Sequence, residues 1–431
     1  MDVKKVILKS APWVIGDAII SLRNRKFDGL RRSGCYGFYR DYYERLLYAS
    51  AGIIADEQHK RFIKLENSLG LKLSELGKQS KAELKKYSLF SNAGKLHEMS
   101  TGGTTGASLK FHLSNEDLQE RAAITDTYWN SVGYYNQKAI WFSGKNFVSP
   151  MDLISKRYYK NDISRNLRYY STFHLSKLDM TAYIRSINDY APEVLIGFPS
   201  TILDIMRYSD ILNCPVNDSI KLILPTAETL NETFYSIIKQ NLPSAKIFDQ
   251  YSSSEGAPFI FQCERGIHHF WCSTGIIERG INPGVPIYNF SGEQGVVTSF
   301  FNRATPLLRY QINDIFEFTD KICECESNYP VVKRIEGRSL DVFISKFTGV
   351  VNQGNLSNST KGVNGLYGFQ IEQPAIDDRN VRVFVSCTES FDPKNQARFR
   401  AALSERIGAY QIQLDYSGLR QSSSGKYRLI I

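Results

Sequence analysis

The sequence contains no apolar run long enough to form a membrane-spanning helix. Such a helix needs about 20 consecutive, mostly apolar residues, and no stretch of the 431 residues reaches that length. The N-terminal segment also lacks the pattern of a secretory signal. Pro12, Gly16 and Asp17 interrupt the apolar residues 11–22, and no small-residue cleavage site follows. We therefore expect a cytoplasmic protein.

The chain has few cysteines, and their number is odd. The chain has seven cysteines, and an odd number in a long chain without an export signal is typical of a reducing compartment rather than of a disulfide framework. The rest of the composition, with 42% hydrophobic and 23% charged residues, is that of an ordinary globular protein. The length predicts two or three domains.

Acidic residues are outnumbered by basic ones, and the net charge is +9. A basic surface can attract nucleic acid, anionic lipid or a polyanionic small molecule, but no nucleic-acid-binding fingerprint is present. Residues 23–32 hold five basic side chains and one acidic side chain, directly after an apolar segment. We interpret residues 11–32 as a core-facing helix with a solvated basic end. The alternative is a peripheral contact with the inner membrane surface.

Two common nucleotide-binding motifs are absent, but a glycine-rich loop is present. The chain has neither the Gly-Lys-Ser/Thr of a Walker A motif nor the dinucleotide fingerprint G-x-G-x-x-G. Residues 100–110 read S-T-G-G-T-T-G-A-S-L-K. Glycine lets the backbone approach a ligand closely, successive N–H groups form an anion-binding nest, and the hydroxyls and lysine add donors. This composition predicts a polyphosphate-binding loop, with a plain linker as the alternative.

Strand and helix patterns alternate through the middle of the chain, which predicts an α/β layered fold. In such folds, ligands bind beyond the carboxyl ends of the strands. We expect a large N-terminal α/β domain of layered sheets and helices over residues 1–340, with a mainly helical lead-in over 1–90. A small, mobile C-terminal α+β lid domain is expected over 341–431. The predicted strands include 139–142, 194–198, 221–224, 245–248 and 381–387, and the predicted helices include 201–208, 232–240 and 393–410.

Further motifs follow the glycine-rich loop. They are Thr226-Ala227-Glu228, Y-S-S-S-E-G from Tyr251, R-Y-Q-I-N-D ending at Asp314, G-R-S-L-D ending at Asp341, and S-G-K-Y-R around Lys426. In this order they resemble the motifs of adenylate-forming enzymes. Within that superfamily the likeness is to the phenylacetate–CoA ligase group, including its relatives encoded with capsule and lipopolysaccharide genes. The motifs span residues 100–428 of the chain.

The resemblance implies a nucleotide-binding role for most of these motifs. In the family, the loop holds the phosphates of ATP, the aromatic residue of the tyrosine motif stacks on adenine, its hydroxyl residue contacts phosphate and its glutamate helps to hold Mg²⁺. These roles correspond here to Tyr251, Ser254 and Glu255. The loop residues that match are Thr101, Gly102, Gly103, Thr104, Thr105 and Gly106.

The remaining motifs are implied to complete the site. Ala227 and Glu228 match the segment that contacts adenine. Asp314 matches the aspartate that holds the ribose hydroxyls, a task that suits a carboxylate because it accepts two hydrogen bonds from a diol. Arg338 belongs to the nucleotide-binding set, and Asp341 is the hinge. The resemblance makes Thr104, Glu255 and Lys426 catalytic, with Lys426 bridging the acyl carboxylate and the nucleotide after lid closure.

The implied function is ATP-dependent activation of a carboxylic acid as an acyl-adenylate, followed by transfer to an acceptor. That acceptor is an amine of an amino acid or sugar in polysaccharide biosynthesis, or the thiol of coenzyme A, as in an aryl- or acyl–CoA ligase. An alternative of another class is a non-catalytic nucleotide-binding or membrane-associated scaffold. It is motivated by Lys110, which stands one place later than the family's lysine, and by Ser252, which replaces a glycine.

Three cysteines and a histidine suggest a second site. Thiolates and imidazole in a tetrahedral set suit structural Zn²⁺, and the phenylacetate–CoA ligase group carries similar Cys/His segments at these places, which supports pairing the two segments here. The alternative is a set of buried free thiols, which behave as small hydrophobes. The expected ligands are Cys263, His268, Cys323 and Cys325, with His269 and Cys272 as nearby substitutes.

Overall fold

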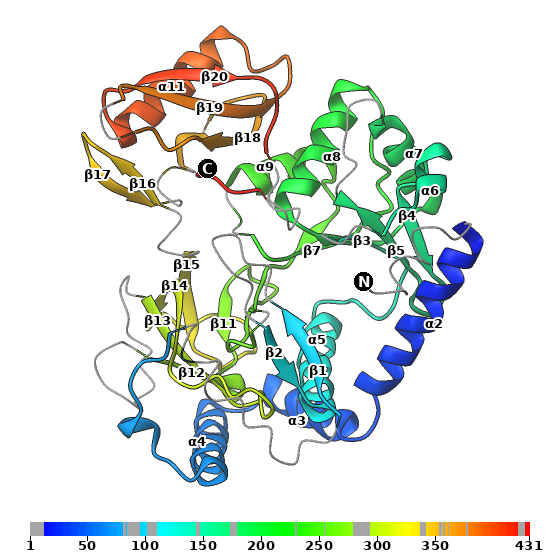
Figure 1. Ribbon diagram of the computed structural model, residues 1–431, viewed down its shortest axis with the longest axis vertical. Coiled ribbons are helices and arrows are strands. Elements are labelled where there is room, and N and C mark those ends of the chain that lie inside the picture. Colours follow the sequence, from blue (N-terminus) through cyan, green and yellow to red (C-terminus); the bar gives the residue numbers. More distant parts are fainter. Residues whose placement is uncertain are drawn as a thin grey trace. The chain divides into compact units, whose positions relative to one another are not determined.

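The computed structural model describes residues 13–80, 83, 95–100, 110–143, 147–172, 179–228, 230, 232–253, 255–278, 294–336, 342–352, 356, 358–360, 362–375, 378–420 and 427–431. By compactness the chain divides into two units, whose elements are drawn in Figure 1. Unit 1 contains Met1–Leu22, Asn136–Ile247 and Ser339–Ile431, and unit 2 contains Arg23–Tyr135 and Phe248–Arg338. The predicted domain boundary near residue 340 stays a prediction.

A six-stranded sheet with the order β4-β5-β3-β6-β7-β8 forms the centre of unit 1. Among these strands β4 pairs antiparallel with β5, and the other pairs are parallel. Every residue of β6 and β7 is buried, as expected for parallel strands with helices on both faces. The strands are β3 (Ala139–Ser143), β4 (Tyr159–Asp162), β5 (Leu167–Ser171), β6 (Val194–Gly197), β7 (Leu222–Pro225) and β8 (Lys246–Ile247).

Helices connect these strands and supply the other half of the core. Apolar side chains of α7 and α8 pack with those of β3, β5, β6 and β7 in one buried cluster. Helix α8 begins at Pro199, where the missing N–H of proline costs no hydrogen bond. The alternating elements confirm the α/β class. The helices are α6 (Pro150–Ile154), α7 (Met180–Tyr190), α8 (Pro199–Ile211) and α9 (Glu232–Asn241), with a short η3 (Ile163–Arg165).

The described residues between 342 and 431 of unit 1 build a small α+β layer with its own core. Helix α11 presents Phe399, Leu403 and Ile407, spaced four residues apart and fully buried, to the apolar side of a three-stranded sheet (Figure 1). This confirms the predicted α+β character. The elements are β16 (Val342–Ser345), β17 (Gly349–Asn352), η6 (Asn358–Thr360), β18 (Leu366–Ile371), β19 (Asn380–Cys387), α11 (Pro393–Ile407) and β20 (Gln411–Asp415).

The N-terminal helix α2 (Trp13–Arg31) contributes its first half to unit 1. Asp17 is buried and pairs with Arg157, and it accepts hydrogen bonds from the backbone N (3.2 Å) and side-chain amide (3.0 Å) of Asn161. Leu22 on the same helix is 66% exposed, and the interpretation of residues 11–32 stays a prediction. Among the helices that the structure describes, none combines the length and the apolar character needed to cross a bilayer.

Unit 2 combines helices with a seven-stranded antiparallel sheet of order β12-β13-β14-β15-β11-β10-β9. A separate hairpin, β1 with β2, pairs Ser100 with Lys110, so both ends of the predicted phosphate loop are held side by side. The helices are α3 (Tyr36–Leu47), α4 (Ala51–Leu69) and α5 (Asn115–Ser131), with short η1 (Leu73–Glu75) and η5 (Cys272–Thr274). The strands are β1 (His97–Ser100), β2 (Lys110–Leu113), β9 (Gln250–Tyr251), β10 (Ile260–Gln262), β11 (His268–Phe270), β12 (Gly275–Glu278), β13 (Gln294–Ser299), β14 (Tyr310–Thr319) and β15 (Val331–Glu336).

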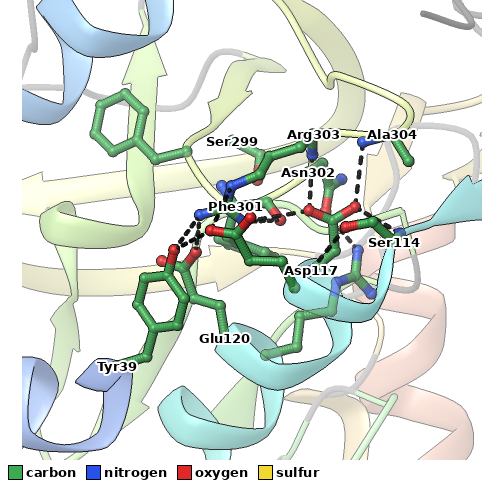
Figure 2. Close-up of polar contacts among 12 residues, drawn as sticks. Tyr39, Ser114, Asp117, Glu120, Ser299, Phe301, Asn302, Arg303 and Ala304 are labelled. Atoms are coloured by element: carbon green, nitrogen blue, oxygen red, sulfur yellow. Dashed lines mark hydrogen bonds and ion pairs between the residues drawn. The ribbon is translucent and has the colours of Figure 1, made fainter. Parts of the chain in front are cut away.

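A buried carboxylate on α5 connects the helices of unit 2 to the loop after β13. Glu120 is fully buried and pairs with Arg61 of α4 (2.6 Å) and with Arg303 (2.5 Å), as Figure 2 shows for Arg303. The hydroxyl of Tyr43 donates a further hydrogen bond to it (2.8 Å). Burial alone raises the pKa of Glu120, but Arg61 and Arg303 outweigh burial and hold that pKa below its ordinary value of 4.5.

We predict that Glu120→Gln strongly destabilises the protein, because Arg61 would lose its buried counter-charge and Arg303 would keep only Asp117 and Glu116. The expected loss of unfolding free energy is about 3–5 kcal/mol, measured by urea denaturation at pH 7. Since the folded-state pKa of Glu120 lies below the unfolded value, its contribution is present above pH 4.5 and is lost as the pH falls through the folded pKa. The gap between wild type and variant should therefore narrow in acid.

Glu116→Gln is the matched control, because Glu116 lies one turn earlier on α5 and its side chain is 43% exposed beside Arg303. An exposed pair is worth about 0–1 kcal/mol. Equal losses in the two variants would show that burial of the Glu120 charge is not the decisive factor.

Candidate functional site

Two of the predicted nucleotide-binding residues meet on the sheet of unit 2. The hydroxyl of Tyr251 on β9 donates a hydrogen bond of 2.6 Å to Oδ2 of Asp314 on β14. Three strands separate β9 from β14 in the sheet order, so the sheet must curl to bring them together. A bond from a hydroxyl to a carboxylate is short and strong. The tyrosine ring also lies edge-on to Phe316, with ring centroids 5.3 Å apart.

The predicted magnesium ligand Glu255 lies in a tightly held turn. Its side chain is buried, and its backbone carbonyl accepts a hydrogen bond from the side-chain amide of Asn302. The next residue, Gly256, has φ +96°, and a Cβ there would lie 2.2 Å from a guanidinium nitrogen of Arg121. Glycine is therefore required at this position by both backbone conformation and space.

Asn302 is a residue that sequence reasoning missed. Its Oδ1 accepts a hydrogen bond of 2.9 Å from Arg121 on α5, so its amide nitrogen is directed toward Glu255. Burial lowers the pKa of Arg121 to about 10, although Asp117 and Glu255 partly offset this effect. The arrangement connects α5 to the backbone of the Glu255 turn through a single amide.

The carboxylate of Asp117 holds the segment that carries Asn302 (Figure 2). It accepts hydrogen bonds from the backbone N–H groups of Arg303 (2.9 Å) and Ala304 (3.1 Å). It also forms a capping box with Ser114 at the start of α5. The S-x-x-D pattern of this box is visible in the sequence, but its contacts with residues 303 and 304 are not.

The predicted adenine-contacting segment lies in unit 1, directly after β7. Ala227 has φ +68°, a left-handed conformation that is uncommon for a residue with a side chain. The carboxylate of Glu228 accepts hydrogen bonds from the backbone N and the hydroxyl of Ser200, both 2.9 Å, and so caps the N-terminus of α8. The segment therefore lies at the carboxyl ends of parallel strands, where α/β sheets bind ligands.

Several predicted site residues lie outside the described residues. Their assignments stay predictions. They are Thr101, Gly102, Gly103, Thr104, Thr105, Gly106, Ser254, Arg338, Asp341 and Lys426.

The predicted thiol–imidazole set is present, but with a different histidine. Potential ligand atoms of Cys263, His269, Cys323 and Cys325 all lie within 4.8 Å of one another. His268 is not part of this set, because its Nε2 lies 3.0 Å from Oδ2 of Asp249. The prediction of His268 as the fourth member is corrected to His269. The physical reason is that successive side chains of a strand point to opposite faces.

Comparison with known proteins identifies the fold. No family model matches the chain. The fold is similar to that of 2-hydroxyisobutyryl-CoA ligase in the postadenylation state in complex with R3-HIB-AMP, with a TM-score of 0.64, 13% identity, and coverage of 99% of this chain and 91% of that chain. The anthranilate CoA ligase in complex with anthranoyl-AMP gives a TM-score of 0.51 and 12% identity, covering 77% of this chain and 65% of that chain. The chain thus has the fold of the adenylate-forming ligases, as its motifs predict.

A relative in sequence makes the assignment more specific. Protein CapK of Staphylococcus aureus is 30% identical over 353 residues, which is 79% of this chain and 76% of CapK. The chain therefore belongs to the same family as CapK.

If Asp314 holds the ribose diol, as the motif resemblance implies, Asp314→Ala is predicted to weaken ATP binding, because the diol would lose a charged acceptor. Such bonds contribute about 1.5–3 kcal/mol, or about 10- to 150-fold in Kd, measurable by calorimetry. Glu317→Gln is the matched control, because it removes a carboxylate from the same strand, β14, that is paired with Lys333 instead. Unchanged affinity in Asp314→Ala would remove Asp314 from the site.

If Glu255 binds Mg²⁺, as the motif resemblance implies, Asn302→Asp is predicted to impair Mg²⁺ use more than it impairs stability. The aspartate can still pair with Arg121, but it cannot donate to the carbonyl of Glu255. Loss of an outer contact of this kind weakens metal binding about 10- to 100-fold, so the Mg²⁺ concentration for half-maximal activity should rise by a similar factor. Asn302→Ala should in addition lower the unfolding free energy by about 1–3 kcal/mol. An unchanged Mg²⁺ requirement in both variants would leave Asn302 a purely structural role.

Proposed function

We propose that this protein uses ATP to activate a carboxylic acid as an acyl-adenylate and then transfers the acyl group to an acceptor. The observation that carries the proposal is the hydrogen bond between Tyr251 and Asp314. It brings together two residues to which the family resemblance assigns the adenine and the ribose of one nucleotide. Membership of the CapK family and the fold shared with a ligase bound to R3-HIB-AMP support the same conclusion.

In the proposed first step, a carboxylate oxygen of the acid attacks the α-phosphorus of ATP. The bond from that phosphorus to the bridging oxygen of the β-phosphate breaks, and pyrophosphate leaves. The protein contributes positioning and charge stabilisation rather than covalent chemistry. The proposal assigns the leaving phosphates to residues 101–106 and the developing charge between acid and nucleotide to Lys426.

Glu255 fits the proposed role of magnesium ligand. A carboxylate is a hard oxygen ligand of the kind that Mg²⁺ prefers, and the buried Glu255 turn is fixed by Asn302 and by the tight space around Gly256. When bound, Mg²⁺ would neutralise phosphate charge.

In the second step the acceptor attacks the acyl carbon, and AMP leaves. We propose an amine of an amino acid or sugar as the acceptor, in polysaccharide biosynthesis, on the strength of the motif resemblance and the likeness to CapK. The alternative is coenzyme A, which the names of the ligases with this fold suggest. We further propose a cytoplasmic location on the sequence pattern alone, with contact of residues 11–32 with the inner membrane surface as the alternative to their role as a core-facing helix.

Exchange of labelled pyrophosphate into ATP, driven by a panel of carboxylic acids, tests the first step. One acid or one class of acids should stimulate the exchange. Release of AMP with that acid is then measured with amines and with coenzyme A in parallel. No exchange with any acid would instead favour the non-catalytic scaffold.

We predict that Lys426→Ala lowers adenylation by about two orders of magnitude or more, as expected for losing a preorganised charge in the transition state. Folding and ATP affinity should change little. The second step, started from a preformed acyl-adenylate, should also change little, because the lid would have turned the lysine away.

Tyr427→Phe is the neighbouring control. The hydroxyl of Tyr427 donates to Asp204 on α8 (3.0 Å), so this variant disturbs the same segment but keeps the lysine. Equal loss of both steps in Lys426→Ala would indicate general damage, and full adenylation would remove Lys426 from the mechanism.

A further inference from the structure

We propose that Cys263, His269, Cys323 and Cys325 bind one Zn²⁺ ion as a closed structural site. This site lies within unit 2, and the proposal does not depend on the adenylation chemistry. The four potential ligand atoms lie within 4.8 Å of one another. Three thiols and an imidazole are a common ligand set for structural zinc.

Two separations between ligand atoms are close to those of a tetrahedral zinc site. Bonds of about 2.3 Å to sulfur and 2.0–2.1 Å to nitrogen place two sulfurs about 3.8 Å apart, and a sulfur and a nitrogen about 3.6 Å apart. The sulfurs of Cys263 and Cys323 are 3.8 Å apart, and Sγ of Cys325 lies 3.3 Å from Nε2 of His269. A disulfide requires about 2.05 Å between its sulfurs, so Cys263 and Cys323 do not form one, and Cys325 is also a free cysteine.

The orientation of His269 is an independent observation. Its Nδ1 lies 2.9 Å from the backbone carbonyl of Tyr329. A carbonyl only accepts, so Nδ1 must carry the proton, and the lone pair is on Nε2, the nitrogen that faces Cys325. Metal-binding histidines are characteristically held in this way by a second hydrogen bond. The ring is also 2% exposed, so solvent cannot satisfy Nε2.

The identity of the metal follows from the donor set. Three sulfurs and one nitrogen exclude the oxygen-seeking Mg²⁺ and Ca²⁺, and iron–sulfur clusters are usually held by four cysteines. Four protein ligands fill a tetrahedral zinc shell and leave no open position for a substrate. The site is therefore structural rather than catalytic.

The proposed ion would join two segments that are distant in the sequence. Cys263 begins the turn between β10 and β11, where its carbonyl accepts from Gly266 (2.9 Å), and His269 lies on β11. Cys323 and Cys325 lie on the connection between β14 and β15. A bound ion would fix β11, whose His268 contacts Asp249, two residues before Tyr251. Zinc would thereby stabilise the sheet edge that carries the tyrosine.

The test is the zinc content of the untagged full-length protein, purified without added metal, by mass spectrometry. We expect about one zinc per chain in the wild type and at least a tenfold lower content in His269→Ala and Cys323→Ser. Two matched controls should keep the metal: His268→Asn alters the neighbouring histidine, and Cys214→Ser removes a thiol of unit 1. A wild type without zinc, or zinc retained by His269→Ala and lost from His268→Asn, would overturn the proposal.

A second measurement tests the site without substitutions, in case the variants fail to fold. Wild-type protein is exchanged with Co²⁺, whose absorption distinguishes a tetrahedral thiolate-rich site from octahedral oxygen ligation. Intense visible bands with sulfur-to-cobalt charge transfer support the site. A weak octahedral spectrum, or no binding, contradicts it.

Discussion

The buried negative charge of Glu120 holds three separate parts of unit 2 together. A carboxylate taken out of water is costly unless it is paired and hydrogen-bonded, and its partners come from three different places: Tyr43 of α3, Arg61 of α4 and Arg303 after β13. All three must be in position before the charge is satisfied. Apolar side chains can stay in contact when a helix shifts along a sheet. The Glu120 network instead requires one position of the helices of unit 2 relative to its sheet.

The same contacts also position residues of the proposed magnesium site. Arg303 follows Asn302 directly, so the contacts that fix Arg303 also fix the amide that holds the Glu255 carbonyl. In unit 1, a single carboxylate has a similar role. Glu228 accepts hydrogen bonds from Ser200 and so caps α8 at the carboxyl edge of the sheet. In both units, residues of the family motifs are therefore part of the framework as well as candidates for ligand contact. Substitutions there need a separate measure of stability.

The sequence predicted the elements whose pattern is local. Buried strands such as β6 and β7 are continuous apolar runs, and α8 starts at a proline. The motif order gave the superfamily and the candidates Tyr251, Glu255 and Asp314. It did not give Asn302 or Arg121, because a contact across 181 residues leaves no trace in spacing. The sequence could not decide between His268 and His269. Adjacent residues on a strand point in opposite directions, so the choice depends on which face of β11 each side chain occupies.

The division of the chain into interleaved units affects the order in which the protein can fold during synthesis. Gln58 of α4 donates to the carbonyl of Gly275, a partner 217 residues later. The helices of unit 2 therefore cannot complete their packing until the later strands of unit 2 have been synthesised. Those strands follow the whole middle segment of unit 1 in the sequence. Unit 2 is complete at Arg338, while unit 1 still lacks the segment Ser339–Ile431. We expect late, non-local closure of both units, and a nascent chain that exposes apolar helix faces for longer than a chain of sequential domains.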